Sequence, residues 1–371
     1  MEVKRQKKFQ AVSIPEDIMF DIFLRLPTPT LFQCRLVSKD WYSFIKNPVF
    51  IDLHKSQIQK DGPRFVLSTW YNKHLYLSDN KLRKSTCIKL INDLSKKEKV
   101  EVVGSSNGLL CLCISTDRDS FYVCNPLTNE VIRLCKPPHE RTDGIFRYTP
   151  DGFAYDETTK TYKVFHTWCC DKSLYRTGIE IYDLGTCKWR MAKEEYIPSY
   201  VRQKSSQVVS NGALHWEIAE STESLEINRR CIGAIHIESE IFWTIEAPSK
   251  GEGITTRTLG SLKGRLCVMD VYMRSTLTVW SMREYGDERS WYQEYDIRRR
   301  DIRPFGFSQT FQTVEETTIL VGSSNRQGYY DPEKKELKQT EIRDIWSQSL
   351  EVFHHVGSLV SPRPKRFKTK G

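Results

Sequence analysis

A strand–turn–strand unit that recurs through the last three hundred residues constrains the fold more than any other feature of this sequence. Each copy has an aromatic or β-branched run, a polar turn and a second such run, which is typical of a β-hairpin. The copies are YVCNPLTNEVIRL at 122–134, FAYDETTKTYKVF at 153–165, IEIYDLGTCKWRM at 179–191, IGAIHIESEIFWTI at 232–245 and YYDPEKKELKQTEI at 329–342. After about residue 60 the sequence therefore predicts an all-β region.

A second unit lies between these hairpins and consists of a glycine followed by an alternating apolar strand. It occurs as NGLLCL at 107–112, NGALHW at 211–216 and KGRLCV at 263–268. Matched turns lie 54, 45 and 49 residues apart, at Asp183, Ile237, Met282 and Asp331. A kelch-type propeller blade repeats at roughly 50 residues and contains four strands. Sandwiches and jelly rolls also use short strands but do not require such a repeat, so we predict a kelch-like β-propeller.

We predict six blades, and the spacing leaves five or seven open. The expected blades lie near 64–94, 103–134, 152–191, 207–245, 257–297 and 304–342. The segment VFHHVGSLV at 352–360 follows the last of them. We expect it to pair back with the first blade and close the ring, because closure removes the exposed edges of an open sheet.

The first fifty residues have a different period, that of short amphipathic helices. Ile18, Ile22 and Leu26 recur at i, i+4 and i+8 and form one apolar stripe. Pro15 suits the first turn of this helix because its missing N–H would have no partner there, and Pro27 ends the helix. A stripe of this kind has to be covered by other apolar surface.

Two more helices are expected before residue 53. Thr28-Pro29 caps and starts the second helix, and Ser38 caps a third one, which Pro48 closes. Three helices of about ten residues each are too small a body to hide their large apolar side chains within themselves. The rest of the chain or a second protein must cover them, and composition alone does not choose between the two.

The stretch SIPEDIMFDIFLRLPTPTLFQCRLVSKDWYSFIKNPVFIDLH at 13–54 resembles an F-box. The match rests on Pro15, Ile18, Ile22, Leu26, Pro27, Leu31, Arg35, Val37, Lys39, Trp41, Ile45, Pro48 and Phe50. The family usually has leucine where this chain has Ile14, a change that conserves volume. In the F-box family this module docks on a Skp-type adaptor, which holds a cullin and its RING subunit, and the resemblance implies the same partners here.

The resemblance assigns the adaptor-binding surface to nine positions. They are Ile14, Pro15, Ile18, Ile22, Leu26, Pro27, Leu31, Val37 and Lys39. For Leu31, Val37 and Trp41 an alternative stays open, in which these side chains pack the core of the module itself.

The later segments resemble the F-box-associated domain of plant F-box proteins. The counterparts are, in order, GSSNGLLCL, YVCNPLTNEVIRL, GFAYDETTKTYKV, VSNGALHW and the final SLVSP. The chain lacks the Gly-Gly doublet that strict kelch repeats carry in each blade, which favours a kelch-like relative over a true kelch array. The predicted organisation is a basic disordered tail at 1–12, an F-box helical domain at 13–55, an F-box-associated propeller at 60–361 and a second basic tail at 362–371.

The function that the resemblance implies involves no catalysis by this chain. The expected role is the substrate-recognition subunit of a Skp–cullin–F-box ubiquitin ligase, whose β domain binds an unknown target protein for ubiquitination. An adaptor-bound F-box protein that acts outside the ligase is the alternative that the sequence leaves open. We expect no cofactor and no metal.

Two motifs that could carry chemistry are better explained by structure. Residues 104–108 (GSSNG) satisfy G-x-S-x-G, but a nucleophile elbow needs a helix after its serine, and the strand-like GLLCLCI follows here. The pair His354-His355 has no H-E-x-x-H or spaced Cys/His set beside it, which argues against a metal site. The rival enzyme hypothesis is a propeller hydrolase or lyase with carboxylates around the channel.

The formal net charge of +9 is concentrated at the two ends. Residues 1–8 and 362–371 together hold +8, so the body of the chain is not a strongly basic surface for phosphates, and nucleic-acid binding by the tails is only a rival hypothesis. The eleven cysteines contain no C-x-x-C pair, and we find no sequon, signal peptide or apolar run of about 18 residues. We therefore expect reduced thiols, no membrane or nucleic-acid partner, and a place in the nucleus, the cytoplasm or both.

Overall fold

The computed structural model of the chain divides into two compact units, one up to Asp61 and one from Gly62 onwards. The residues that it describes are 14–58, 64–69, 74–79, 85–88, 99–117, 119–138, 146–148, 151–170, 176–192, 208–221, 227–248, 253–273, 275–303, 312–313, 318–323, 326–339 and 350–363. The tail predicted at 1–12 lies outside the described residues, as does the tail at 362–371 except for its first two residues. None of the described helices is long and apolar enough to cross a membrane.

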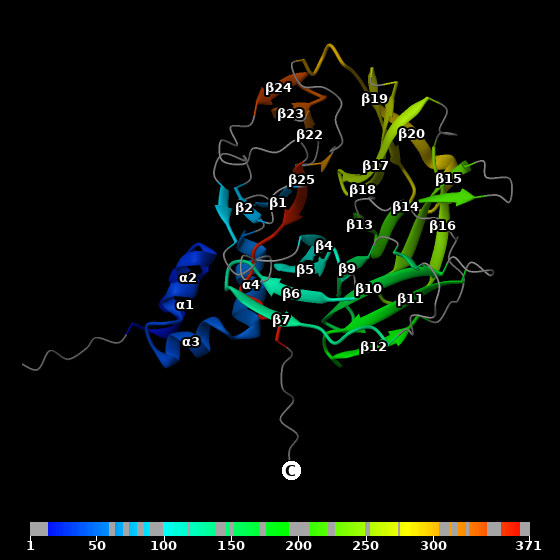
Figure 1. Cartoon of the computed structure of the whole chain (residues 1–371). Coiled ribbons are helices and arrows are strands. Elements are labelled where there is room, and N and C mark those ends of the chain that lie inside the picture. The colour runs from blue at the N-terminus through cyan, green and yellow to red at the C-terminus, as the bar shows by residue number, and fades with distance from the viewer. Residues whose placement is uncertain are drawn as a thin grey trace, which may run out of the picture. The chain divides into compact units, whose positions relative to one another are not determined.

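The first unit consists of four helices: α1 (Glu16–Leu24), α2 (Thr28–Cys34), α3 (Lys39–Ile45) and α4 (Pro48–Ile58) (Figure 1). Local signals set where they start. As predicted, Ser38 caps α3, because its Oγ accepts a hydrogen bond from the Trp41 N–H at 3.1 Å. Pro15 and Pro27 directly precede α1 and α2.

The prediction of three helices is wrong, because Pro48 starts a fourth helix as well as closing the third. Asn47 Oδ1 accepts a hydrogen bond from the Val49 N–H at 2.9 Å and thereby caps α4. A proline at the first helical position loses no hydrogen bond, since N–H groups in the first turn have no partner within the helix. The pair Asn47-Pro48 is therefore a start signal, and treating the proline only as a helix breaker misses α4.

Aromatic rings form the interior of the helical unit. The ring of Phe20 contacts those of Phe44 and Phe50 at centroid separations of 5.6 and 5.5 Å. Phe23 packs edge-on against Trp41 at 4.9 Å. Edge-to-face pairs of this kind contribute about 0.5–1.5 kcal/mol each beyond the burial of their area. The helices thus share one small core, which uses one face of α1.

The second unit is a β-propeller of six sheets, which confirms the predicted fold class (Figure 1). The first sheet contains β25 (Leu350–His355), β1 (Arg64–Thr69), β2 (Leu75–Ser78) and β3 (Ser85–Cys87). The second contains β4 (Val100–Ser106), β5 (Leu109–Ile114), β6 (Phe121–Asn125) and β7 (Glu130–Arg133). The third contains β8 (Phe146–Tyr148), β9 (Gly152–Asp156), β10 (Thr161–Cys170), β11 (Arg176–Asp183) and β12 (Lys188–Met191). The fourth contains β13 (Val208–Ser210), β14 (Ala213–Ser221), β15 (Ile227–His236) and β16 (Phe242–Glu246). The fifth contains β17 (Ile254–Leu262), β18 (Arg265–Tyr272), β19 (Thr276–Met282) and β20 (Trp291–Arg298), and a short 3-10 helix, η2 (Glu288–Ser290), comes just before β20. The sixth contains β21 (Gln312–Thr313), β22 (Ile319–Ser323), β23 (Arg326–Asp331) and β24 (Glu336–Gln339).

The last strand closes the ring, as predicted. β25 pairs antiparallel with β1 over six residues of each strand. The strand ends before the predicted segment does, and the following residues bind the second blade, where Asn125 Nδ2 donates to the carbonyl oxygens of Ser358 and Val360 at 2.9 and 2.7 Å. Gly108 has a φ of +85°, and a Cβ atom there would lie 2.0 Å from Ser358 Oγ. Only glycine therefore lets the C-terminal segment approach this turn.

The third blade has five strands instead of four. The long strand β10 pairs with β9 through residues 161–165 and with β8 through residues 168–170. The blade predicted at 152–191 therefore begins too late and omits β8. A strand of three residues is too short for its side-chain alternation to stand out in the sequence.

The recurrent hairpins share one turn geometry, which explains why the motif repeats. In the third blade, Asp183 Oδ1 accepts hydrogen bonds from the N–H groups of Gly185 and Thr186 at 2.7 and 3.0 Å. Asn125, Asp156 and Asp331 make the equivalent bonds. In all five copies the residue four positions after the start of the turn has a φ between 54° and 62°, at Asn129, Lys160, Cys187, Glu240 and Lys335. An Asx turn that ends in a left-handed residue therefore fixes the register of most of these hairpins.

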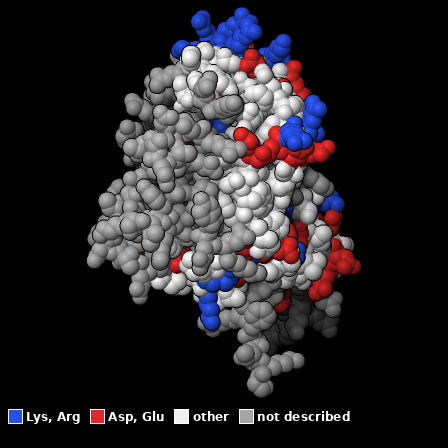
Figure 2. Space-filling view, turned by 90° about the vertical axis from the view of Figure 1, so that its right-hand side faces the viewer, with Lys and Arg blue, Asp and Glu red and all other residues white. Residues whose placement is uncertain are grey.

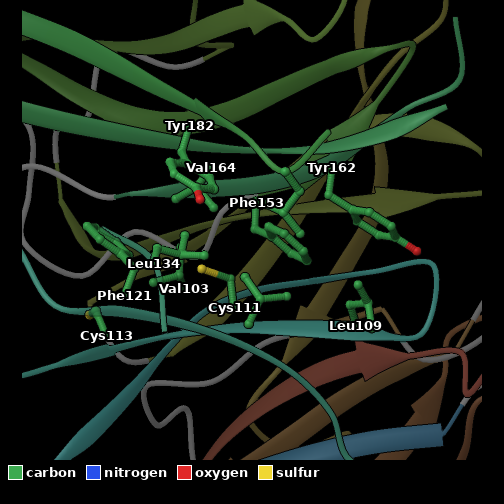
Figure 3. Packing of buried hydrophobic residues seen from close by; sticks show 12 residues of the cluster. Val103, Leu109, Cys111, Cys113, Phe121, Leu134, Phe153, Tyr162, Val164 and Tyr182 are labelled. Atoms are coloured by element: carbon green, nitrogen blue, oxygen red, sulfur yellow. The ribbon is translucent and has the colours of Figure 1, made fainter. Parts of the chain in front are cut away.

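Apolar side chains fill the spaces between neighbouring blades. The cluster in Figure 3 joins the second blade to the third and includes Cys111, Phe121, Phe153 and Val164. Phe121 and Phe153 have no exposed surface. Burial raises the pKa of the Cys111 thiol, which keeps it protonated and unreactive. The propeller thus completes its own core from strands of adjacent sheets.

Candidate functional site: an exposed apolar surface on the helical unit

Three isoleucines in and just before the N-terminal helix α1 are exposed. Ile14, Ile18 and Ile22 are 52%, 54% and 45% exposed. Isoleucine is among the residues most often fully buried, so three exposed copies together are unusual. Ile18 and Ile22 lie one turn apart on the same side of α1, and Ile14 comes just before the helix, whose N-cap is Pro15. We call these three exposed side chains the isoleucine stripe.

The opposite face of α1 explains why this stripe points outward. Phe23 is only 3% exposed and packs on Trp41 and Phe44 with centroid separations of 4.9 and 5.6 Å. One helix cannot turn both faces into the same small core. Beside the stripe, Arg25 Nη2 lies 2.6 Å from Asp21 Oδ2, an exposed i, i+4 pair that contributes about 0.5 kcal/mol at most. The aromatic face therefore fixes the helix and leaves the aliphatic face exposed.

Further exposed apolar side chains extend the surface beyond α1. Leu36 and Val37, between α2 and α3, are both exposed, and Leu36 reaches 80%. Tyr42 on α3 is exposed as well, and so are Val49 and Leu53, one turn apart on α4. Of these five, sequence reasoning selected only Val37. The i, i+4 spacing of Val49 and Leu53 could have revealed these two residues in the sequence. That spacing is informative only if the segment is recognised as a helix, α4.

The nine predicted adaptor contacts do not all reach the surface. The exposed ones are Ile14, Pro15, Ile18, Ile22, Pro27, Val37 and Lys39. Leu26 is half-buried. Leu31 has no exposed surface, which favours the packing role that the sequence leaves open for it, and the adaptor contacts themselves stay predictions. The alternative of a packing role thus fits Leu31 and the half-buried Trp41, but it does not fit Val37.

The energetics of this surface favour binding to another protein. Full burial of an isoleucine side chain contributes about 1.5–3 kcal/mol, so covering the exposed halves of the three isoleucines contributes about 2–4 kcal/mol before the cost of association. Monomeric soluble proteins rarely expose contiguous apolar patches of this kind unless a partner covers them. The arrangement can provide affinity, and it presents no group that is poised for a reaction.

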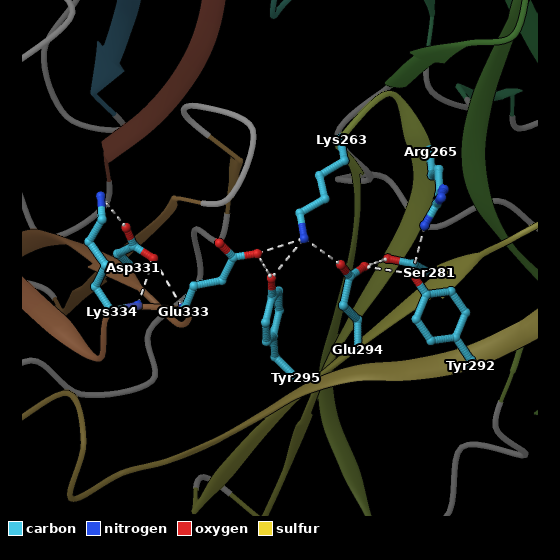
Figure 4. A network of polar contacts seen from close by, with 9 residues as sticks. All are labelled: Lys263, Arg265, Ser281, Tyr292, Glu294, Tyr295, Asp331, Glu333 and Lys334. Carbon is cyan, nitrogen blue, oxygen red and sulfur yellow. Dashed lines mark hydrogen bonds and ion pairs between the residues drawn. The ribbon is translucent and has the colours of Figure 1, made fainter.

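The propeller holds its buried charges in networks that connect neighbouring blades. Lys163 Nζ in the third blade lies 2.8 Å from Asp156 and 2.9 Å from Glu240, which belongs to a turn of the fourth blade. Burial alone would lower the pKa of Lys163, but hydrogen bonds with these two carboxylates raise it overall. At the surface, Lys263 Nζ in the fifth blade lies 2.8 Å from Glu333 in the sixth, and both side chains are exposed (Figure 4). Ion pairs thus connect neighbouring blades both in the interior and at the surface.

The motifs weighed for chemistry take part in contacts between strands. Ser106 Oγ accepts a hydrogen bond from the Tyr155 N–H at 3.0 Å and so holds β4 against β9. Ser105 Oγ lies 3.0 Å from His355 Nδ1, which links β4 to β25. Within the part of the chain that the structure describes, no three His, Cys, Asp or Glu side chains are grouped so as to hold a metal ion.

Charged side chains on the face shown in Figure 2 are mixed in sign. Basic side chains gather at the upper end of this view, and acidic and basic ones are interspersed below them. Independently of this view, a short exposed basic run, Arg298, Arg299 and Arg300, lies at and just after the end of β20 and is followed by Asp301. The described residues of this face therefore do not form the continuous positive surface that neutralises many phosphates.

Two protein families match this chain, and together they cover nearly all of it. The F-box domain matches residues 12–53. The F-box associated beta propeller domain matches residues 59–361, which is more than half of the chain. This chain is a plant F-box protein. Its helices belong to the F-box and its propeller to the F-box-associated domain, and neither family description names an enzyme.

The F-box protein is similar to proteins of Arabidopsis thaliana along most of its length. It is 26% identical to F-box protein CPR1, over 94% of this chain and 89% of that protein. It is 29% identical to F-box protein At3g07870, over 77% and 72% of the two chains. It is also 27% identical to F-box/kelch-repeat protein At3g23880, over 78% and 81%. The similarity therefore extends over most of each of these chains.

Proposed function

We propose that this F-box protein is the substrate-recognition subunit of a Skp–cullin–F-box ubiquitin ligase. The observation that carries the proposal is the exposed stripe of Ile14, Ile18 and Ile22 within the segment that matches the F-box. A Skp-type adaptor covers this stripe, and through the adaptor the chain joins a cullin and its RING subunit. The other adaptor contacts are Pro15, Leu26, Pro27, Val37 and Lys39, extended by Leu36, Val49 and Leu53.

The propeller binds the target protein and supplies no reactive group. In this mechanism the complex holds the target beside a conjugating enzyme that carries ubiquitin. Ubiquitin transfer accelerates because tethering raises the effective concentration of the target's lysines and orients them. The contribution of the F-box protein is therefore affinity at two surfaces, one on each unit.

The experiment replaces two exposed isoleucines by a charged residue. Ile18→Asp plus Ile22→Asp buries two carboxylates without partners if the adaptor binds there, so we expect adaptor capture to fall by more than 100-fold. Both side chains lie outside the aromatic core, so the helical unit should stay folded. Met273→Asp, at an exposed apolar position of the propeller, is the matched control and should keep full adaptor binding. Capture of the double variant at wild-type strength would refute the proposal.

A receptor that binds the adaptor but acts outside the ligase remains the second candidate. Both candidates require the isoleucine stripe, so the adaptor experiment does not separate them. A ubiquitination assay with propeller-bound proteins in a reconstituted complex separates them. A ligase subunit should have its target ubiquitinated only when cullin and RING are present. A receptor outside the ligase should bind its target stably without any ubiquitination.

We also propose that the protein works in the nucleus, the cytoplasm or both, without membrane or nucleic-acid partners. All nine cysteines whose state the structure describes are free thiols, as expected in a reducing compartment. Imaging of the tagged full-length chain tests this proposal. Accumulation in the secretory pathway would contradict it.

A further inference from the structure

Four exposed arginines gather at the end of the last strand of the fifth blade. Arg298 ends β20, Arg299 and Arg300 follow it directly, and Arg303 comes three residues later. Within the part of the chain that the structure describes, Arg298, Arg299 and Arg303 form no salt bridge, and Arg300 Nε lies 3.7 Å from Asp301 Oδ1. These guanidinium groups are therefore available to a partner.

The turn that carries the arginines is held in place by the core and by its own hydrogen bonds. Ile297 and Ile302, on either side of the turn, are buried in the cluster that joins the fifth blade to the sixth. The Arg298 N–H donates to Asp301 Oδ2 at 2.9 Å, and the Asp301 N–H donates to the Arg298 carbonyl oxygen at 2.8 Å. Since this backbone is already ordered, a partner that binds the arginines does not have to order it, which lowers the entropic cost of binding.

The neighbouring connection, between β18 and β19, contributes an exposed methionine at the same end of the blade (Figure 1). Arg298 lies opposite Thr276 in the pairing of β19 with β20, and the Arg299 N–H donates to the Ser275 carbonyl oxygen at 2.9 Å. Met273 belongs to the same connection as Ser275. It is 77% exposed, the highest value among the large apolar residues described in the propeller. An exposed apolar side chain thus lies in the connection that contacts the basic turn.

The charge of this surface is positive but limited in extent. Residues 298–303 contain four arginines and one aspartate, which gives +3. Asp296, in β20 just before the arginines, is exposed and accepts a hydrogen bond from Thr278 Oγ1 at 3.4 Å. Nucleic acid is bound by longer basic surfaces that neutralise many phosphates, so a smaller anionic partner fits better. We define the arginine surface as Met273, Arg298, Arg299, Arg300 and Arg303.

The arrangement of the arginines favours several carboxylates over one phosphate. An arginine fork matches a carboxylate and can bind it with two parallel hydrogen bonds. Successive residues of an extended chain point in opposite directions, so consecutive arginines at the end of a strand do not converge on a single anion. A partner with separate carboxylates along its chain can pair with each of them.

We propose that the arginine surface is the docking site for an acidic segment of the target protein. In this segment Asp or Glu side chains pair with the arginines, and an apolar side chain contacts Met273, whose flexible thioether adapts to different shapes. The inference rests on the proposed function, because it takes the propeller as the unit that binds the target. It adds the chemistry by which the target is recognised and the blade that recognises it.

The experiment measures binding of the full-length chain to a fluorescein-labelled peptide of alternating Glu and Ser with one central Leu. Fluorescence anisotropy should show binding that weakens as salt is added, because salt screens exposed charges. Arg299→Glu plus Arg300→Glu replaces attraction by repulsion and should lower the affinity about tenfold or more. No binding to the wild type, or equal affinity for the wild type and this double variant, would overturn the proposal.

A second double variant controls for the change in overall charge. Arg283→Glu plus Arg289→Glu lies in the exposed connection between β19 and β20, at the other end of the same blade. It changes the net charge equally, and peptide affinity should stay within about twofold of the wild type, since distant exposed charges are screened. Equal losses in the two double variants would overturn the assignment. Thermal unfolding checks that both are folded, and Arg299→Ala plus Arg300→Ala, with an expected loss of about threefold, replaces a charge-reversed variant that unfolds.

Two further comparisons test the chemistry of the partner. Met273→Ala should weaken binding of the leucine peptide about threefold and leave unchanged the binding of a peptide with Ser in place of Leu. Equal losses for the two peptides would contradict the apolar contact. A single-stranded oligonucleotide of the same charge should bind more weakly than the leucine peptide. Tighter binding of the oligonucleotide that requires the same arginines would overturn the proposal in favour of a nucleic-acid site.

Adaptor capture separates a failure of this inference from a failure of the proposed function. Arg299→Glu plus Arg300→Glu should capture the adaptor at wild-type strength, and Ile18→Asp plus Ile22→Asp should bind the peptide at wild-type strength. A wild-type chain that binds the peptide but not the adaptor would contradict the proposed function and support the docking site. A wild-type chain that captures the adaptor but does not bind the peptide would overturn the docking site alone.

Discussion

The helical unit and the propeller place their large apolar side chains in opposite ways. Eight large apolar residues are exposed in the described part of the helical unit, whereas four are exposed in the described part of the much larger propeller. The propeller shares its core between adjacent blades and buries rings such as Phe121 completely. The four helices hold only one small core around Phe23, and their second face stays exposed. We therefore expect a partner to cover the exposed face of the helical unit, whereas the propeller completes its own core.

The largest effect should come from breaking the buried ion network of the propeller. Lys163→Ala leaves Asp156 and Glu240 without the ammonium group that lies 2.8 and 2.9 Å away. Removing one partner of a buried ion network costs about 3–5 kcal/mol, because the remaining charges stay buried. Denaturant unfolding of the full chain, followed by tryptophan fluorescence, measures this loss.

A lysine three residues earlier in the same hairpin provides the control for this loss. Lys160 pairs with Glu157 at 3.1 Å, and both side chains are exposed. Lys160→Ala should therefore change the free energy of unfolding by less than about 0.5 kcal/mol. Equal effects at the two lysines would mean that the propeller does not depend on its buried charges.

Truncation of one isoleucine in each unit compares a buried side chain of the propeller with an exposed one of the helices. Ile181 has no exposed surface and belongs to the core between the third and fourth blades. Ile181→Ala should lower the free energy of unfolding by about 2–4 kcal/mol and leave adaptor affinity unchanged. Ile18→Ala should change stability by less than about 0.5 kcal/mol and weaken adaptor binding about tenfold. Thermal unfolding measures the stability of both variants, and titration measures their affinity for the adaptor. An Ile18→Ala protein that lost stability but bound the adaptor at full strength would contradict the expected difference between the two units.

The stability of the propeller should depend on pH through a buried histidine. His166 Nδ1 lies 2.7 Å from Asp151 Oδ1, and Asp119 and Glu180 also face the ring. Burial alone would lower the pKa of His166, but these carboxylates raise it to about 9. The stabilisation is therefore fully present below the unfolded pKa of about 6.5 and is lost as pH rises through 9, with a magnitude on the order of 3 kcal/mol.

Comparison with His166→Gln isolates this contribution from other groups that titrate at high pH. The unfolding free energy of the wild type should fall relative to that of His166→Gln between pH 6.5 and pH 9. Parallel pH profiles for the two proteins would show that His166 does not carry a proton in the folded propeller.

The smallest effect should come from the helix cap that the sequence predicted. Ser38→Ala removes the acceptor for the Trp41 N–H at the start of α3 and should destabilise the helical unit by about 1 kcal/mol. The propeller should keep its unfolding free energy. Hydrogen exchange at the amides of α3 measures the local loss, and an equal change across the propeller strands would contradict the independence of the two units.

Sequence reasoning succeeded where one residue type dictates the local geometry. Ser38 caps a helix, Asp183 begins an Asx turn, and the repetition of that turn reveals the blades. It failed where one residue has two roles, as at Pro48, which ends one helix and starts another. It also could not determine which apolar residues face inward, since that depends on how the helices pack, and it therefore left both a binding and a packing role open for the buried Leu31.

Hydrogen exchange of the full chain with and without a Skp-type adaptor shows which surface the adaptor covers. We expect the adaptor to slow exchange in α1 and α4 and in the segment around Leu36, and to leave the propeller amides unchanged. Slower exchange confined to the propeller, or no change in α1 at saturating adaptor, would contradict the claim that the exposed apolar face of the helices is the docking surface.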